Sequence, residues 1–183
     1  MSRVYTRTGD DGTTALLYGG RVSKGGELVD ALGDIDEAVS ALGVARAGYG
    51  NAQRAALLLR LQRELFVVAA DLAVSPKRRN RLKPGISLVT AEMTSELEQL
   101  IDTLTAEHPL RPVFLVPGTT QHEAAIDLAR TVVRRAERHT VQTKIAGHPV
   151  SDDVGCYLNR LSDLLFVMAR QAADGAEEPP SHD

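Results

Sequence analysis

Four arginines and a glutamate fall within ten consecutive residues, ARTVVRRAER (129–138), in a stretch otherwise rich in alanine and valine. A helix turns about 100° per residue, so a helix here would gather most of its charges in one third of the helical wheel. That third contains Glu123, Asp127, Arg130, Arg134, Glu137 and Arg138. Arg135 falls on the flank, and the opposite side carries Leu128, Ala129, Val132, Val133 and Ala136. Such a charged row is either a solvated face joined by i,i+3 and i,i+4 ion pairs or a site for an anion.

A second stretch that could bind an anion is the glycine-rich leader, residues 1–26, which holds six of the fifteen glycines. Its motif TRTGDDGTT (6–14) is either a small hairpin turning at Asp11-Gly12 or a phosphate-cradling loop. In the loop, Gly9 and Gly12 would let backbone N–H groups approach a phosphate. The polar side chains available to such a loop are Thr6, Thr8, Thr13, Thr14, Arg7 and Lys24. The Walker A order of glycines and lysine is absent.

Most of the remaining chain has the apolar spacing of bundle helices. Leu28, Leu32, Ile35, Val39 and Leu42 are spaced four, three, four and three residues apart, which places them on one helical stripe. Similar stripes predict helices from the Gly48 to Asn51 break to before Pro76, from about Thr90 to His108, from Thr120 to Ile145 and from Ser151 to Ala173. Thr120 and Glu123 form a capping-box pattern, and Asp36 lies on the flank of the first stripe. The expected fold class is all-α, with short turns joining antiparallel helices.

The composition limits the classes of function. The chain has 183 residues, a formal net charge of −3 and a pI near 6.0, so no global positive field would attract nucleic acid or membrane. The single cysteine, Cys156, excludes an internal disulfide framework and, with no membrane-length apolar run, predicts a cytoplasmic protein. We expect one domain, residues 1–173, and a disordered acidic tail, residues 174–183. The basic segment Lys77 to Lys83 is interpreted as a solvated loop in preference to a nucleic-acid site.

Acid–base and covalent catalysis have no obvious residues in this chain. The five histidines are scattered, and no Cys/His cluster has the spacing of metal ligands. The polar groups that remain suit the holding of a polyphosphate. A reaction whose nucleophile arrives with the substrate would need only orientation and stabilisation of a leaving polyphosphate.

Six motifs, in order, resemble those of the propanediol-utilisation (PduO) type of ATP:cob(I)alamin adenosyltransferase. They are TRTGDDGTT, the following Lys24, DIDE (34–37), FLVPG (114–118), ARTVVRRAER and LNRLSD (158–163). The resemblance implies a five-helix bundle with a ferritin-like up-and-down core and a glycine-rich N-terminal ATP loop, residues 1–26. It also implies a homotrimer with ATP between subunits, in which cob(I)alamin attacks the 5′ carbon of ATP to give adenosylcobalamin and triphosphate.

The resemblance also implies site residues. The residues that would bind ATP are Thr6, Arg7, Thr8, Gly9, Thr14, Ala15, Lys24, Arg134, Arg135, Glu137, Arg138 and Asn159. Arg134 would stabilise the departing triphosphate, and Arg130 would pair with Asp36 of another subunit. Phe114 would press on the lower face of the corrin, leaving cobalt four-coordinate and easier to reduce. Mg²⁺ would travel with ATP, and no protein ligand for it is indicated.

Three positions depart from the family pattern: Thr119 replaces a glycine or serine, Asp127 stands where histidine is common, and the segment 77–92 is dissimilar. The rival interpretation is a non-catalytic carrier or sensor of ATP or cobalamin, which would be expected to lose Arg134, Lys24 or the TRTG motif. All of these are present. A reductase and an adenosylcobalamin-dependent enzyme are the further partners that the resemblance implies.

Overall fold

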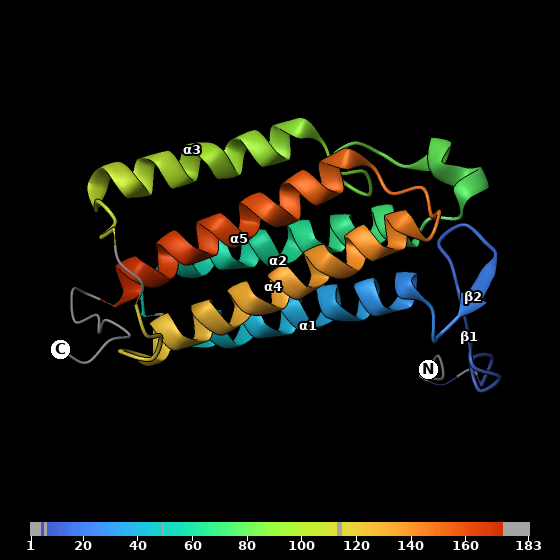
Figure 1. The fold of residues 1–183 in the computed structure, drawn as a ribbon, viewed down its shortest axis with the longest axis horizontal. Coiled ribbons are helices and arrows are strands. Elements are labelled where there is room, and N and C mark those ends of the chain that lie inside the picture. The colour runs from blue at the N-terminus through green and yellow to red at the C-terminus, as the bar shows by residue number, and fades with distance from the viewer. Residues whose placement is uncertain (1–4, 6, 49, 113–114, 174–183) are drawn as a thin grey trace.

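The computed structural model describes residues 5, 7–48, 50–112 and 115–173. Across them the chain forms five long α-helices, one 3₁₀ helix and a two-stranded sheet (Figure 1). The elements in order are β1 (Thr13–Ala15), β2 (Arg21–Ser23), α1 (Glu27–Ala47), α2 (Ala52–Ala73), η1 (Pro76–Arg81), α3 (Ala91–Glu107), α4 (Gln121–Ile145) and α5 (Asp152–Ala172). The all-α prediction is therefore confirmed.

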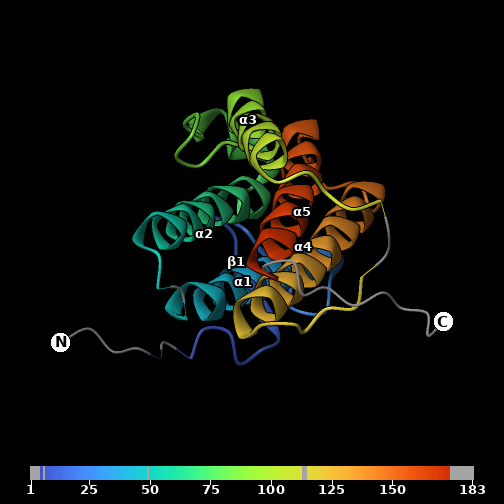
Figure 2. The same cartoon turned by 90° about the vertical axis from the view of Figure 1, so that its left-hand side faces the viewer.

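Four of the helices form the bundle, and α3 covers one of them from outside. Helix α1 packs against α2 and α4, α4 packs against α5, and α5 packs against α3. Viewed end-on, α1, α2, α5 and α4 surround a common interior, with α3 lying over α5 (Figure 2). Since α4 lies between α1 and α5, its side chains contact acids on both neighbours.

The interior is built from the apolar stripes that the sequence predicts. Leu42 of α1, Leu61 of α2, Ile126 of α4 and Leu158 of α5 are all fully buried, and Leu97 of α3 joins the same cluster. Apolar residues at three- and four-residue spacing form the buried face of each bundle helix, mainly leucine on α2 and α5 and mainly alanine and valine on α4. Burial of this face aligns the helices and fixes the direction of the charged side chains on α4.

Two helix starts are capped by side chains. Asn51 Oδ1 accepts from the backbone N–H groups of Gln53 (2.9 Å) and Arg54 (3.0 Å), which begins α2. Thr120 Oγ1 accepts from Glu123 N at 3.0 Å, so the predicted cap of α4 is confirmed. The Glu123 carboxylate bonds instead to the N–H groups of Gly118 and Thr119, in the loop before the helix.

Two assignments on the α4 wheel are wrong. Glu123 and Asp127 are only 1% and 4% exposed, while Leu128, placed on the apolar side, is 59% exposed. The reason is the position of α4 between α1 and α5: Arg170 of α5 reaches both acids, so one edge of the charged row faces inward. A wheel drawn from a single helix cannot include this partner.

The leader forms a hairpin, but its centre is not where the sequence places it. Strands β1 and β2 are antiparallel with Thr14 opposite Val22, so the chain reverses between them, over residues 16–20. The Asp11-Gly12 step forms a local turn instead, because Asp11 Oδ1 accepts from both the backbone N–H and the hydroxyl of Thr13. These hydrogen bonds also hold the pKa of Asp11 below its usual value.

The basic segment is also more ordered than the expected solvated loop. Residues Pro76–Arg81 form η1, and Arg79 makes an ion pair with the buried Asp71. No helix among the described residues is long and apolar enough to cross a membrane. The tail, residues 174–183, lies outside the described residues.

Candidate functional site

The hairpin closes on itself through Lys24. The Lys24 ammonium donates to the carbonyl of Gly9 at 2.8 Å, and the Lys24 backbone N–H donates to Gly12 O at 2.9 Å. A β-carbon added at Gly9 would lie 3.1 Å from Lys24 Nζ and 3.3 Å from Thr13 O. Glycine at position 9 therefore lets the backbone approach the lysine closely.

Arg21 is a member of this site that the sequence interpretation missed. Its Nε donates to Thr13 Oγ1 at 2.8 Å and its Nη2 donates to Thr13 O at 3.2 Å and to the carbonyl of Thr8. One guanidinium thus ties β2 to the loop before β1. The strand register, in which Arg21 lies opposite Ala15, could have indicated Arg21. That register follows only when the chain reversal is placed at residues 16–20 and not at Asp11-Gly12.

Lys24 and Arg21 line a small polar cavity of about 270 Å³ inside the hairpin. Its lining residues are Thr8, Gly9, Thr13, Thr14, Ala15, Arg21 and Lys24. Two cations with hydroxyls and accessible backbone suit an anionic group such as a phosphate. Of the predicted leader residues, the structure brings Thr8, Gly9, Thr14, Ala15 and Lys24 together here.

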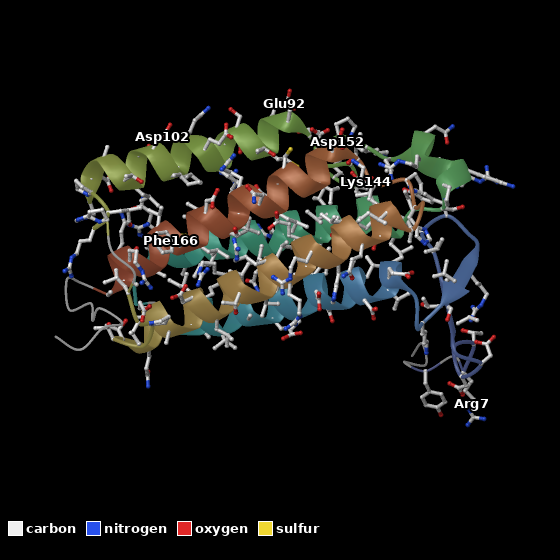
Figure 3. The ribbon with its side chains drawn as sticks, viewed as in Figure 1. Arg7, Glu92, Asp102, Lys144, Asp152 and Phe166 are labelled. Carbon is white, nitrogen blue, oxygen red and sulfur yellow. The ribbon has the colours of Figure 1, made fainter. Side chains whose placement is uncertain are left out.

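Of the other two leader residues, Arg7 does not line the cavity. Arg7 has a left-handed backbone (φ 61°) and its guanidinium lies 5.7 Å from the centre of the Tyr5 ring. Figure 3 shows Arg7 at the far end of the hairpin, directed away from the helices. Thr6 lies outside the described residues.

On α4, Arg134 and Arg138 are exposed, and Arg138 Nη1 donates to Arg134 O at 3.1 Å. Asn159 of α5 donates to the Glu137 carboxylate at 3.0 Å. Within the described residues no ion pair engages Arg134. The structure therefore groups four of the predicted residues, Arg134, Glu137, Arg138 and Asn159, on the outer surface of α4 and α5.

Arg135 faces a different way. Its Nε donates to Asp34 Oδ1 at 2.9 Å and its Nη2 forms an ion pair with Glu37, both on α1. His139 Nδ1 lies 2.6 Å from the other oxygen of the same Asp34 carboxylate. The hydrogen bond to Asp34 raises the pKa of Arg135 above its usual value. These contacts fasten α4 to α1.

Arg130 forms an ion pair with Asp127 of its own helix. Asp36 is exposed on α1, and within the described part of the chain no ion pair joins it to Arg130. The predicted Arg130–Asp36 contact was assigned between subunits, so a single chain does not test it.

A buried charge cluster lies where α4 and α5 meet the loop 115–120. Arg170 Nη2 donates to Glu123 Oε1 at 2.6 Å and to Asp127 Oδ2 at 2.9 Å, and its side chain is only 7% exposed. The second Glu123 oxygen accepts from Gly118 N at 2.5 Å and Thr119 N at 3.1 Å. Glu123 therefore anchors this loop to α5 through charge-assisted hydrogen bonds.

A cavity of about 540 Å³ lies beside this anchor, lined by loop residues together with Asp127, Arg130, Arg170 and Phe166. Figure 3 shows Phe166 toward this end of α5. Phe114, which the sequence assigns to the corrin, lies outside the described residues.

The hairpin and the loop 115–120 lie at opposite ends of the bundle (Figure 1). Helix α4 spans 25 residues, or about 37 Å, and Arg134 lies near its middle. One chain therefore holds the hairpin cavity, the α4 arginines and the loop apart from one another. Together these features define a helical-bundle protein equipped to hold a polyanion.

Comparison with known proteins identifies the class more closely. The family model of cobalamin adenosyltransferase matches residues 4–172. A corrinoid adenosyltransferase of Citrobacter freundii is 42% identical over 172 residues, 93% of this chain and 94% of that protein. One from Mycobacterium tuberculosis H37Rv is 40% identical, over 94% of this chain and 89% of that protein. The chain belongs to the cobalamin adenosyltransferase family.

Solved structures agree with this assignment. A phenylalanine-to-histidine variant of a PduO-type ATP:corrinoid adenosyltransferase from Lactobacillus reuteri, complexed with cobalamin and ATP, has a TM-score of 0.85. It is 31% identical, over 97% of this chain and 95% of that one. An arginine-to-lysine variant of an enzyme of this type from the same organism, complexed with ATP, has a TM-score of 0.84 at 30% identity, over 98% of this chain and all of that one. The predicted resemblance is confirmed.

Proposed function

We propose that this protein transfers the 5′-deoxyadenosyl group of ATP to the cobalt of cob(I)alamin, giving adenosylcobalamin and triphosphate. Cobalt donates an electron pair to form the bond to C5′ and is formally oxidised from Co(I) to Co(III). The C5′–O bond breaks, and its electrons leave with the triphosphate. The observation that carries the proposal is the membership of residues 4–172 in a family whose solved relatives bind both cobalamin and ATP.

The reaction needs no general base, because Co(I) is already a strong nucleophile. The protein must hold the two substrates in line and offset the charge that develops on the triphosphate. We assign Arg134 to stabilise the charge on the triphosphate, since within the described residues no acid neutralises this arginine. Lys24 and Arg21 would hold the phosphates from the hairpin side, with Thr8, Gly9, Thr14 and Ala15 around them.

Glu137, Arg138 and Asn159 would border the nucleotide beside Arg134. Arg135 would orient α4 through Asp34 and Glu37, so we expect its influence on ATP to pass through the helix. Phe114 would lie against the corrin and keep the lower axial position of cobalt free. The Glu123 anchor, four residues from the loop's Thr119, supports this role by fixing the base of the loop.

The site would be shared between subunits of a homotrimer. The separation of the hairpin from the loop 115–120 in one chain supports this arrangement. Val44 of α1 and Leu128 and Val141 of α4 are each at least half exposed, which suits contact with a neighbouring copy. Arg130 would then meet Asp36 of that neighbour.

Mg²⁺ would enter with ATP. Among the described residues, no group of three or more His, Cys, Asp or Glu side chains could hold a metal ion. We assign the ion to the ATP phosphates and name no protein ligand for it. A cytoplasmic reductase would supply Co(I), and an adenosylcobalamin-dependent enzyme would receive the product.

The proposal is tested by incubating the protein anaerobically with chemically reduced cobalamin, ATP and Mg²⁺. We expect a light-sensitive cobalt–carbon product together with one triphosphate for each cobalamin converted. The rival function, a carrier or sensor, predicts bound ATP and no such product. Binding without turnover would therefore overturn the proposed function.

A further inference from the structure

The basic segment Lys77 to Lys83 has no part in the proposed reaction, yet one of its arginines is paired with a fully buried acid. Arg79 Nη2 lies 2.6 Å from Asp71 Oδ1, and Asp71 is completely buried. Arg79 Nη1 also donates to Pro149 O at 2.9 Å, between α4 and α5. The second Asp71 oxygen accepts from Val89 N at 3.0 Å. This pair fixes η1 to the ends of α2, α3 and α4.

The hairpin docks directly beside this fixed segment. Leu17, in the reversal between β1 and β2, donates its N–H to Ala73 O at 2.8 Å. The N–H of Ser75 donates back to Leu17 O at 3.0 Å, which makes a parallel bridge between Leu17 and Val74. Val74 is only 3% exposed, so the hairpin adds a strand-like contact to the well-packed end of α2.

A cation–π contact completes the attachment. The Arg81 guanidinium lies 4.2 Å from the centre of the Tyr18 ring. Tyr18 has a left-handed backbone (φ 65°), a conformation that is unfavourable for a residue with a bulky side chain. The chain reversal places Tyr18 in this unfavourable backbone conformation. The cation–π contact with Arg81 therefore helps to stabilise it.

We propose that η1 is a platform that sets the position of the nucleotide hairpin, with Arg81 as its positioning residue and Arg79 as the clamp beneath it. The inference rests on the proposed role of the hairpin in ATP binding. An isolated two-stranded hairpin is marginal in water, and in the described part of the chain neither strand packs extensively on a helix. Contacts with the platform thus stabilise a hairpin whose three-residue strands would be only marginally stable alone.

The test compares Arg81→Ala with Arg78→Ala in the full-length protein. Both changes remove one positive charge from η1, but within the described residues the Arg78 side chain has no bonded partner. We expect Arg81→Ala to raise the KM for ATP about three- to fivefold, the scale of an exposed cation–π contact. The kcat at saturating ATP and the KM for cobalamin should stay within about twofold. Arg78→Ala should leave all three constants unchanged.

Hydrogen exchange gives a readout that does not depend on activity. In the absence of ATP, Arg81→Ala should speed exchange of the Leu17 and Ser75 amides, which bond across the platform, and leave core amides of α1 unchanged. Tyr18→Leu should have the same effect, and the double variant should be no worse than either single one. Tyr18→Phe, which keeps the ring, should behave as wild type.

Three outcomes would overturn the inference. Equal losses from Arg81→Ala and Arg78→Ala would mean that the segment acts by charge alone. Unchanged exchange at Leu17 and Ser75 would mean that Arg81 does not hold the hairpin. Additive effects of the Tyr18 and Arg81 changes would mean that the two side chains act independently. Faster exchange with an unchanged KM for ATP would instead confirm the platform and contradict the proposed role of the hairpin in ATP binding.

Discussion

The arginines of α4 differ in what neutralises them, although all four fall within nine residues, Arg130 to Arg138. Arg130 is paired with Asp127, and Arg135 is paired with Asp34 and Glu37. Neither Arg134 nor Arg138 has an acidic partner within the described residues, but Arg138 Nη1 already donates to the carbonyl of Arg134. A guanidinium whose charge is not already compensated has the most to gain from a phosphate. This difference makes Arg134 the residue of the row best suited to an anion.

We therefore expect Arg134→Ala to lower kcat by a factor on the order of 10² to 10³, the cost of removing a group that stabilises developing charge. Helical content by circular dichroism should not change, because Arg134 is exposed and makes no interhelical ion pair in the described chain. Thr131→Ala, at a second exposed α4 position, is the matched control. A nearly normal rate for Arg134→Ala would show that another arginine meets the triphosphate.

At this scale the sequence indicated residues that lie together in one motif and missed contacts between distant parts of the fold. Glycine and threonine spacing indicated Gly9, Thr14 and Lys24, which do line one cavity. Arg21 was missed because its bonds to Thr8 and Thr13 depend on a strand register that the sequence alone misplaced. The burial of Glu123 and Asp127 was missed because their partner, Arg170, comes from another helix.

Among the elements, the loop before α4 is held by one buried carboxylate. Glu123 binds Gly118 and Thr119 on one side and Arg170 on the other, so it joins the loop to both α4 and α5. A loop anchored this way has a fixed base, which suits the presentation of a side chain to a large planar substrate. Phe114 is four residues before Gly118.

Glu123→Ala should lower the free energy of unfolding by about 3 kcal/mol, because it removes one of the two carboxylates that pair with the buried Arg170. It should also raise the KM for cobalamin more than the KM for ATP. Chemical denaturation and steady-state kinetics check the two effects. Gln121→Ala, at an exposed position two residues earlier, should cost under about 0.5 kcal/mol. Equal stability of the two variants would contradict the anchor.

Phe114→Ala tests the role of the loop in the chemistry. We expect it to slow the reaction more when the substrate is supplied as cob(II)alamin with a reductant than when it is supplied as pre-reduced cob(I)alamin. The reason is that excluding the lower axial ligand eases reduction and has less effect on the attack of Co(I) on ATP. Rates measured anaerobically from both oxidation states check this, and equal losses would contradict the assigned role.

The helices were predictable because each is specified mainly by its own apolar stripe. The Thr120 cap and the Leu28 to Leu42 stripe appear in the structure as expected. The hairpin and η1 were less predictable because their order comes from contacts between segments: Leu17 with Ala73, Arg81 with Tyr18, and Arg79 with Asp71. Local sequence preference carries little information about such pairings.

In the molecule as a whole, the arrangement of the candidate site favours an assembly. The hairpin cavity lies beyond one end of the bundle and the loop 115–120 at the other, with Arg134 near the middle of α4 (Figure 1). Exposed apolar side chains on α1 and α4, among them Val44 and Val141, lie on the two helices that carry Asp36 and the arginines. A neighbouring copy packed there would bring its hairpin to this chain's α4.

The central claim is that the hairpin of one subunit and α4 of its neighbour form each site. The most direct test co-expresses Lys24→Ala and Arg134→Ala chains with different tags and purifies the mixed oligomers. Each variant alone should be inactive. Each mixed trimer has one interface in three that pairs an intact hairpin with an intact α4, so about a third of wild-type activity should return. Purified mixed oligomers that remain inactive would show that both residues act within one chain.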